Sequence, residues 1–145
     1  MPAPELQIRV DTRERGKLIK RLEQLEGVIL TFVELEVGDY ILPGGIVVEH
    51  KSATDLILSV VDESLWENVK KLGDTYDKVV YIVEGDPYTA RFHQKALDIH
   101  RAMAHMTIAK DVSILPSPDA DNSAMLIYLM GLAALERATR EPPAS

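Results

Sequence analysis

The chain of 145 residues contains no cysteine, which excludes disulfide bonds, a thiolate zinc site and a cysteine nucleophile. Aromatic residues are also sparse at 6%, and core packing is the simplest interpretation of the single tryptophan, Trp66. The longest apolar run, from Ala124 to Leu135, is shorter than the roughly 20 residues that span a bilayer. The first residues lack the basic and apolar regions of a signal peptide. We therefore expect an intracellular protein with no membrane partner.

Positive charge is scarce too, because 16 Lys and Arg residues stand against 23 Asp and Glu, for a net charge of −7. A stand-alone nucleic-acid-binding domain is usually basic, since contacts to phosphates supply much of its affinity. The basic residues nevertheless gather in three groups: Arg13, Arg15, Lys17, Lys20 and Arg21; Lys70 and Lys71; Arg91, His93 and Lys95. Each group is either a binding surface or only the solvated face of a helix.

The hydrophobic patterns are typical of one α/β domain, and a hydrophobic fraction of 46% is ample for its core. Strands are expected at residues 6–10, 28–37, 46–51, 79–83 and 112–115, with a short strand carrying Asp39. Helices are expected at residues 15–26, 55–61, 65–76, 94–110 and 119–139. This order predicts a mixed central sheet flanked by helices, in a domain of residues 1–139 followed by a tail or linker at 140–145.

The most informative stretch joins Asp39, a Pro-Gly-Gly turn, and the strand that carries Glu49 and Lys51. Side chains two residues apart on a strand share one face at a separation of about 6.6 Å, so Glu49 and Lys51 point together and His50 points away. Asp39 lies just across the hairpin. We therefore expect two carboxylates and one ammonium group to converge on a small volume.

This trio suits metal-assisted hydrolysis. Neighbouring carboxylates repel each other unless a cation lies between them, and Mg²⁺ or Mn²⁺ prefers such oxygen ligands. A lysine beside the ion can hold the attacking water and offset the charge of a phosphate. In the alternative interpretation, Glu49 and Lys51 form an ordinary surface pair and Asp39 belongs to a turn.

The last expected helix is apolar on nearly every side between Ala124 and Leu135, and Asp121 or Ser123 is expected to cap it. Helices of this kind are buried all round. A helix at the end of a small domain would be half exposed in a monomer, so we predict a homodimer interface there. Full burial within one subunit is the alternative.

Two other kinds of site find little support. His93, His100 and His105 are spaced by seven and five residues, which does not align them on one helical face, so no zinc site is predicted. The chain also lacks a glycine-rich phosphate loop and a nucleophile elbow, which argues against an α/β enzyme acting on small molecules.

Several segments together resemble the XPF family of structure-specific endonucleases. VDTRE (10–14), VGDY (37–40) and VEHKSATDL (48–56) match that family's VDxRE-like start, GDY turn and ERKxxxD motif. LWENVKKL (65–72) and VYIVEG (80–85) look like the archaeal members, including the nuclease part of Hef. The resemblance runs over nearly the whole chain in the right order.

The resemblance implies a restriction-endonuclease-like fold with a PD-(D/E)xK core. It makes Asp39 and Glu49 metal ligands, assisted by the backbone carbonyl of His50. Lys51 would place the water, and Asp11 would support the metal shell. His50 departs from the family, which has arginine there, but strand alternation points its side chain away from the metal.

The resemblance also implies roles outside the metal ligands. Arg13 and Glu14 would orient the scissile phosphate and its neighbours. Asp55 would be either a supporting group or an ordinary helix-cap residue. The basic residues expected to contact DNA are Arg13, Arg15, Lys17, Lys70 and Lys71.

By resemblance, we expect a Mg²⁺- or Mn²⁺-dependent endodeoxyribonuclease that cleaves branched DNA, such as flaps and forks, in repair or replication-fork processing. It would work in the cytoplasm near the nucleoid, or in the nucleus of a eukaryote. The family usually appends a helix-hairpin-helix pair, so DNA affinity is expected to come from another domain or from a partner such as a sliding clamp. The alternative is a non-catalytic subunit that binds DNA or an active nuclease.

Overall fold

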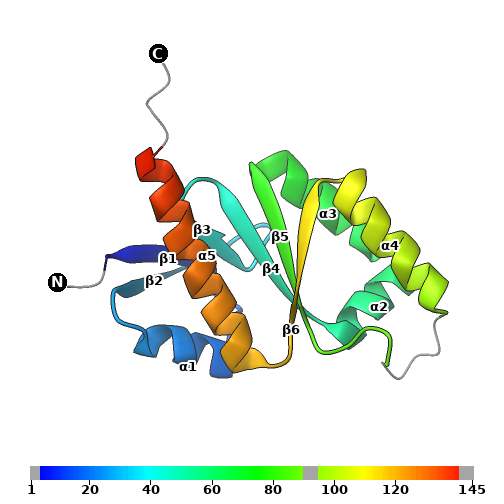
Figure 1. The fold of residues 1–145 in the computed structure, drawn as a ribbon, viewed down its shortest axis with the longest axis horizontal. Helices are drawn as coiled ribbons and strands as arrows, with labels where there is room; N and C mark the ends of the chain where they lie inside the picture. The colour runs from blue at the N-terminus through cyan, green and yellow to red at the C-terminus, as the bar shows by residue number, and fades with distance from the viewer. Residues whose placement is uncertain (1–3, 90–94, 141–145) are drawn as a thin grey trace, which may run out of the picture.

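A mixed sheet of six strands runs through the middle of the molecule (Figure 1). The computed structural model describes residues 4–89 and 95–140. Its strands are β1 (Leu6–Asp11), β2 (Val28–Val33), β3 (Tyr40–Leu42), β4 (Ile46–Ser52), β5 (Lys78–Glu84) and β6 (Val112–Ser117). Its helices are α1 (Lys17–Gln24), α2 (Ala53–Val61), α3 (Ser64–Thr75), α4 (Ala96–Ile108) and α5 (Ala120–Arg140). The predicted helix start at residue 94 and the predicted tail beyond Arg140 lie outside the described residues.

The strand order β2-β1-β3-β4-β5-β6 determines where the site lies. β3 is antiparallel to both β1 and β4, whereas the other neighbouring pairs are parallel. The carboxyl ends of β1, β4, β5 and β6 therefore lie at the same end of the sheet, and β3 begins there. Ligands of open α/β sheets bind at this end, outside the carboxyl ends of the strands.

Helices cover both faces of the sheet. α1 and α5 pack on one face, where Leu22 and Ile127 are fully buried in the same core cluster as Ile82 of β5. α2, α3 and α4 pack on the other face, where Leu65 and Met106 are fully buried. β5 is apolar on both sides between these layers, as its uninterrupted run of apolar residues predicts.

The mixed sheet flanked by helices is confirmed, and so is the order of its elements. The second strand is shorter than predicted, however, and ends at Val33 instead of Val37. Val33, Leu35 and Val37 alternate with glutamates as a half-buried strand would. Beyond Val33, the chain instead forms a loop whose Leu35 and Val37 are buried without a strand partner.

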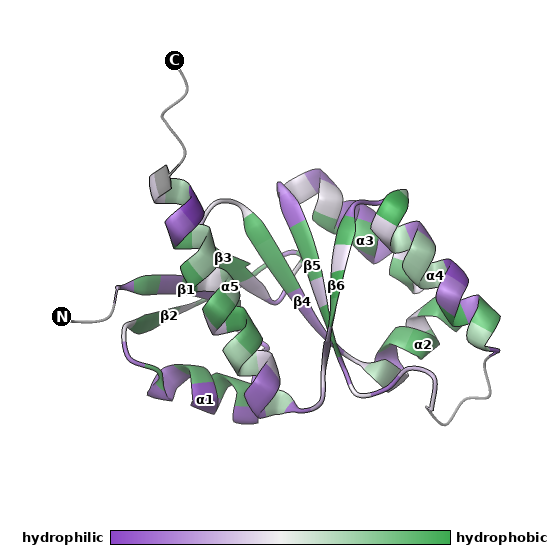
Figure 2. Ribbon diagram, in the orientation of Figure 1, coloured by the Kyte–Doolittle hydropathy of each residue, from purple (hydrophilic) through white to green (hydrophobic). Residues whose placement is uncertain are grey.

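Helix α5 crosses the sheet next to β1, where Gly131 allows close contact. A Cβ atom on Gly131 would lie 2.6 Å from a methyl group of Leu6. Figure 2 shows hydrophobic colours along the middle of α5, and its Leu129 is 54% exposed, so the helix is not buried all round. Even so, no helix among the described residues has the length and apolar character to cross a membrane.

Candidate active site

The site begins where Asp11 ends β1. Asp11 is 2% exposed, and its Oδ1 accepts a hydrogen bond from the backbone N–H of Leu35 at 3.0 Å. Its own N–H donates to the backbone oxygen of Asp39 at 2.9 Å. Because Asp11 takes the N–H of Leu35, β2 cannot continue its pairing, and the following loop is tied back to the end of β1.

Both side-chain oxygens of Asp11 have partners. Its Oδ2 accepts from Arg13 Nε at 2.7 Å, and Arg13 Nη2 donates to the backbone oxygen of Leu35 at 3.1 Å. Burial acts to raise the pKa of Asp11, but the hydrogen bonds from Arg13 and Leu35 and the charge of Arg13 together bring it below its usual value. Asp11 therefore anchors the loop and Arg13, whose side chain is still 72% exposed to solvent.

Asp39 is held by the backbone on either side of it. Gly38 has φ +100°, and a Cβ at that position would lie 2.5 Å from Val47, so the turn needs glycine. The N–H of His50 donates to Asp39 Oδ2 at 2.8 Å. The C=O and N–H of one strand residue point to the same side, so the carbonyl of His50 also points toward Asp39.

Glu49 projects from β4 on the face covered by α3. Its Oε2 is the one buried side-chain nitrogen or oxygen in the described part of the chain that has no hydrogen-bond partner. Asn68 of α3 donates to the hydroxyl of Tyr81 at 2.9 Å and also favours the charged form of Glu49 through a hydrogen bond. α3 thus supports the carboxylate from one side and leaves Oε2 unsatisfied.

The two carboxylates titrate far above their usual range. Burial first, and the negative charge of Glu49 second, raise the pKa of Asp39 to about 8. Burial likewise raises the pKa of Glu49 to about 7, although the ammonium group of Lys51 counteracts this shift. The electrostatic coupling of Glu49 with both Asp39 and Lys51 indicates that the three side chains lie near one another at this end of the sheet.

Glu14 adds a third negative charge to this edge. Its Oε2 accepts a hydrogen bond at 2.8 Å from the hydroxyl of Tyr40, which is fully buried. The charge of Glu14 contributes to the raised pKa values of Asp39 and Glu49. Glu14 and Arg13 therefore flank the carboxylate pair with opposite charges, and their predicted role in orienting a phosphate stays a prediction.

The oxygen atoms of this site fit a hard divalent cation. A cation would give Glu49 Oε2 a partner and would relieve its repulsion with Asp39. No group of three or more His, Cys, Asp or Glu side chains within residues 4–89 and 95–140 could share such an ion. Mg²⁺ is commonly held by one or two carboxylates together with water, so Asp39, Glu49 and the carbonyl of His50 suffice as ligands.

The opposite face of β4 carries a polar network whose contacts could not be predicted from the sequence. His50 Nε2 lies 2.9 Å from Glu84 Oε1, and Ser123 Oγ donates to the same oxygen at 2.8 Å. Asp121 or Ser123 was predicted to cap the last helix, but α5 begins at Ala120, and Asp119 Oδ1 accepts the N–H of Asn122 instead. From the sequence, only the direction of the His50 side chain, away from Glu49 and Lys51, could be predicted, because its partners come from distant segments.

Asp55 lies in the first turn of α2, where its N–H donates to Ser52 Oγ at 3.0 Å. Ser52 is therefore the N-cap, as its type and position predict. The side chain of Asp55 is exposed, which agrees with an ordinary place in a capped first turn. Its supporting role at the metal site remains a prediction.

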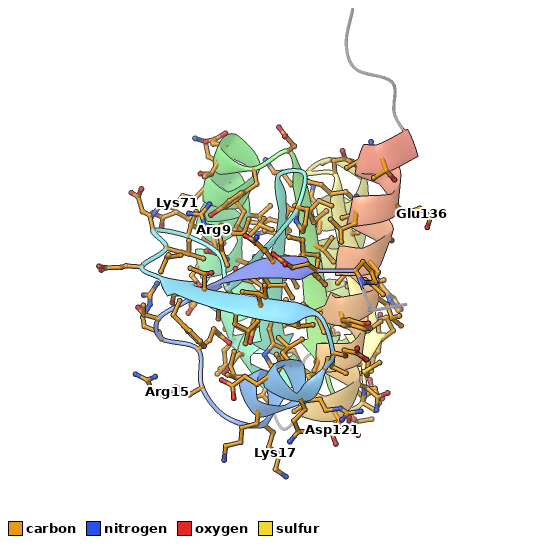
Figure 3. The ribbon with its side chains drawn as sticks, turned by 90° about the vertical axis from the view of Figure 1, so that its left-hand side faces the viewer. Arg9, Arg15, Lys17, Lys71, Asp121 and Glu136 are labelled. Carbon is orange, nitrogen blue, oxygen red and sulfur yellow. The ribbon has the colours of Figure 1, made fainter. Side chains whose placement is uncertain are left out.

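The predicted DNA-binding residues lie on separate surfaces. Figure 3 shows Arg15 and Lys17 extending away from the ribbon near α1, with Lys71 on another part of the surface. Lys70 and Lys71 each pair with a carboxylate one helical turn away on α3, at 3.2 and 3.4 Å. Exposed pairs of this kind are weak, so both lysines can still exchange their partner for a phosphate.

The fold is the restriction-endonuclease-like nuclease fold. The chain superposes on the structure of XPF from Aeropyrum pernix in complex with DNA with a TM-score of 0.85 and 28% identity, over 92% of this chain and 66% of that one. The DNA-free XPF structure from the same organism gives a TM-score of 0.86 over 96% of this chain and 69% of that one.

The chain belongs to the ERCC4 domain family, whose model matches residues 10–130. It is 31% identical over 123 residues to the 3'-flap repair endonuclease Xpf of Saccharolobus solfataricus, which covers 84% of this chain and 53% of the relative. It is 38% identical over 78 residues to the DNA repair endonuclease XPF of Mus musculus, covering 54% of this chain and 8% of that relative. The chain therefore spans about half the length of the archaeal relative.

Proposed function

We propose that this chain is a Mg²⁺- or Mn²⁺-dependent endonuclease domain that hydrolyses phosphodiester bonds in branched DNA, such as flaps and forks. The observation that carries the proposal is the partly buried pair of Asp39 and Glu49, in which the buried Oε2 of Glu49 has no partner. Membership of the ERCC4 domain family supports nuclease activity, and the relative from Saccharolobus is named for 3'-flaps.

Each residue of the site has a distinct part in this proposal. Asp39, Glu49 and the carbonyl of His50 would hold the ion, which would neutralise phosphate charge and make a coordinated water more acidic. The ammonium group of Lys51 orients the attacking water and stabilises negative charge that develops on the phosphate. Arg13 is already oriented by Asp11, so its exposed guanidinium can bind a neighbouring phosphate without losing much side-chain entropy.

The test is a panel of labelled flap, fork, duplex and single-stranded DNA, with and without Mn²⁺. We expect metal-dependent cleavage of flap or fork DNA by the natural chain and none by Asp39→Ala. Glu23→Ala serves as a matched control, since it removes an exposed carboxylate of α1 far from the site. Unchanged cleavage by Asp39→Ala would refute the site, whereas no Mn²⁺ binding and no cleavage at high protein concentration would favour a non-catalytic subunit.

We also propose that α5 contributes to a homodimer. Leu129, within the apolar middle of this helix, is 54% exposed, and a second copy would cover it. Sedimentation at tens of micromolar protein should show a dimer that Leu129→Glu weakens, and a monomer for the natural chain would contradict this. The net charge of −7 further supports a DNA-gripping domain or a clamp as an additional partner.

A further inference from the structure

A chain of polar side chains, from the partly buried His50 and Glu84 to the fully buried Ser123, lies on the face of the sheet opposite the carboxylate pair. His50 Nε2 lies 2.9 Å from Glu84 Oε1, and Ser123 Oγ donates to that same oxygen at 2.8 Å. The contact with Glu84 therefore holds the His50 ring in one orientation.

The hydroxyl groups behind Glu84 fix its position. Ser123 is fully buried, and its Oγ lies 2.8 Å from Oγ of Ser117, which is 3% exposed. The backbone oxygen of Ser117 accepts the N–H of Gly85 at 2.8 Å. These contacts join the ends of β4, β5 and β6 to the first turns of α5.

His50 connects this network to the metal site. On one face of β4, its ring contacts Glu84, while its backbone N–H donates to Asp39 Oδ2 at 2.8 Å. Its sequence neighbour Glu49 projects from the other face. A rotation of the strand at His50 would therefore move the hydrogen bond to Asp39 and the direction of Glu49 at the same time.

We propose that Glu84, itself held by Ser123, is a positioning residue for the metal ligands. By fixing the ring of His50 on one face of β4, it fixes the backbone of His50 and the carboxylates of Asp39 and Glu49 on the other. Glu84 touches neither the ion nor the DNA. The inference deepens the proposed function and depends on it.

The network has the features of a positioning device. Polar groups removed from water are costly unless they have partners, and this network joins its members by contacts of 2.8 to 2.9 Å. Residues that orient metal ligands from behind typically change metal affinity by about 10- to 100-fold when they are replaced. Only a general loss of stability would result if Glu84 merely held the strands together.

The main test is calorimetric titration of Mn²⁺ alone into the natural chain and into Glu84→Ala and Ser123→Ala. We expect about 10-fold weaker Mn²⁺ binding in both variants. Glu84→Gln should restore most of the affinity, because its amide oxygen can still accept from His50. Ser113→Ala is the matched control: Ser113 accepts from Lys78 Nζ at 2.9 Å and so bridges β5 and β6 at the opposite end of the strands.

A second measurement needs no metal. Hydrogen exchange of the His50 amide reports its bond to Asp39, and we expect faster exchange in Glu84→Ala with little change in the central amides of β5. In a His50→Ala background, Glu84→Ala should weaken Mn²⁺ binding no further, because Glu84 acts through the ring. If Glu84→Ala does not fold, Ser123→Ala and Glu84→Gln decide the question.

The outcomes separate this inference from the proposed function. Natural affinity in Glu84→Ala with unchanged exchange at His50 would overturn the inference alone. An equal loss of affinity in Glu84→Ala and Ser113→Ala would also overturn it, since that result indicates general destabilisation. If the natural chain and Asp39→Ala both fail to bind Mn²⁺, the proposed function falls and the inference falls with it.

Discussion

The two faces of β4 differ in whether their polar side chains have hydrogen-bond partners. On the α5 side, Glu84 Oε1 contacts both His50 and Ser123, within a closed network. On the α3 side, Glu49 Oε2 is buried with no partner, close to the second carboxylate of Asp39. Polar groups that satisfy one another stabilise the fold, whereas a buried oxygen left unsatisfied is costly and favours a ligand. One strand thus presents a structural network and a candidate metal site, separated by the thickness of the sheet.

A second contrast lies within the site itself. Asp11 accepts hydrogen bonds at both oxygens, and its pKa is below the usual value. Asp39 accepts one backbone N–H, and its pKa is raised to about 8. The ionised form of Asp11 therefore stabilises the metal-free protein, and the ionised form of Asp39 destabilises it.

The largest effect is expected on the cleavage rate when Glu49 or Lys51, on the α3 side of β4, is replaced. Glu49→Gln and Lys51→Met should each lower the cleavage rate of flap DNA by about 10³-fold, because the first removes a carboxylate that holds the ion and the second removes the ammonium group that stabilises charge on the phosphate. Single-turnover kinetics with Mn²⁺ measures this loss. Ser59→Ala is the control, since its hydroxyl bonds only within α2. A fall of less than tenfold in both site variants would contradict their assigned roles.

Asp11→Asn should destabilise the fold by about 2 kcal/mol, because an amide cannot satisfy both Arg13 and the N–H of Leu35 as a carboxylate does. Since the folded-state pKa of Asp11 is lowered, its contribution is present above the ordinary carboxylate pKa near 4 and disappears as pH falls below it. Urea unfolding at several pH values tests both points. A variant as stable as the natural chain at pH 7 would show that Asp11 does not anchor the loop.

Asp39→Asn should have the opposite effect and stabilise the metal-free protein at pH 8, by about 1–2 kcal/mol or a rise in Tm of roughly 3–6 °C. The folded-state pKa of Asp39 is raised, so the natural chain loses stability as pH rises from about 4 toward 8. The difference between the two proteins should therefore shrink at pH 5. Thermal scans with EDTA present measure this, and a variant less stable than the natural chain at pH 8 would contradict the repulsion.

The smallest effect is expected on the exposed face of α3. Lys70→Ala and Lys71→Ala should each change stability by less than about 0.5 kcal/mol, because their ion pairs are exposed. If these lysines contact phosphates, each variant should reduce the salt dependence of DNA binding by about one unit of slope. Fluorescence anisotropy with fork DNA across a salt series measures that slope. An unchanged slope would remove both residues from the DNA-binding surface.

Much of the fold and the carboxylate pair followed from local rules. Strand alternation and the turn near Gly38 were enough to bring Asp39 and Glu49 to one edge. The end of β2 could not be predicted, because it depends on Asp11 capturing the N–H of Leu35, which lies 24 residues away. The predicted second strand was four residues too long, because the buried residues of the loop after Val33 alternate with exposed ones as they would in a strand.

The polar network on the α5 side could not be predicted from local patterns either, because its partners are far apart in the sequence. Ser123 has the residue type and position of a helix cap, and a capping rule assigns it to its own helix. The structure places it 2.8 Å from Glu84, 39 residues earlier in the chain. Nothing local to either residue marks this contact. Long-range polar pairing is therefore what the structure adds to the sequence analysis.

The central claim is that Asp39 and Glu49 share a divalent ion, and calorimetry in two buffers of different ionisation enthalpy tests it most directly. The raised pKa values mean that the metal-free pair retains a proton near pH 7, which binding must expel. We predict that a single Mn²⁺ binds per chain with release of about one proton at pH 7, and that Glu49→Gln abolishes both. Absence of Mn²⁺ binding by the natural chain, or undiminished binding by Glu49→Gln, would show that Asp39 and Glu49 do not share a divalent ion.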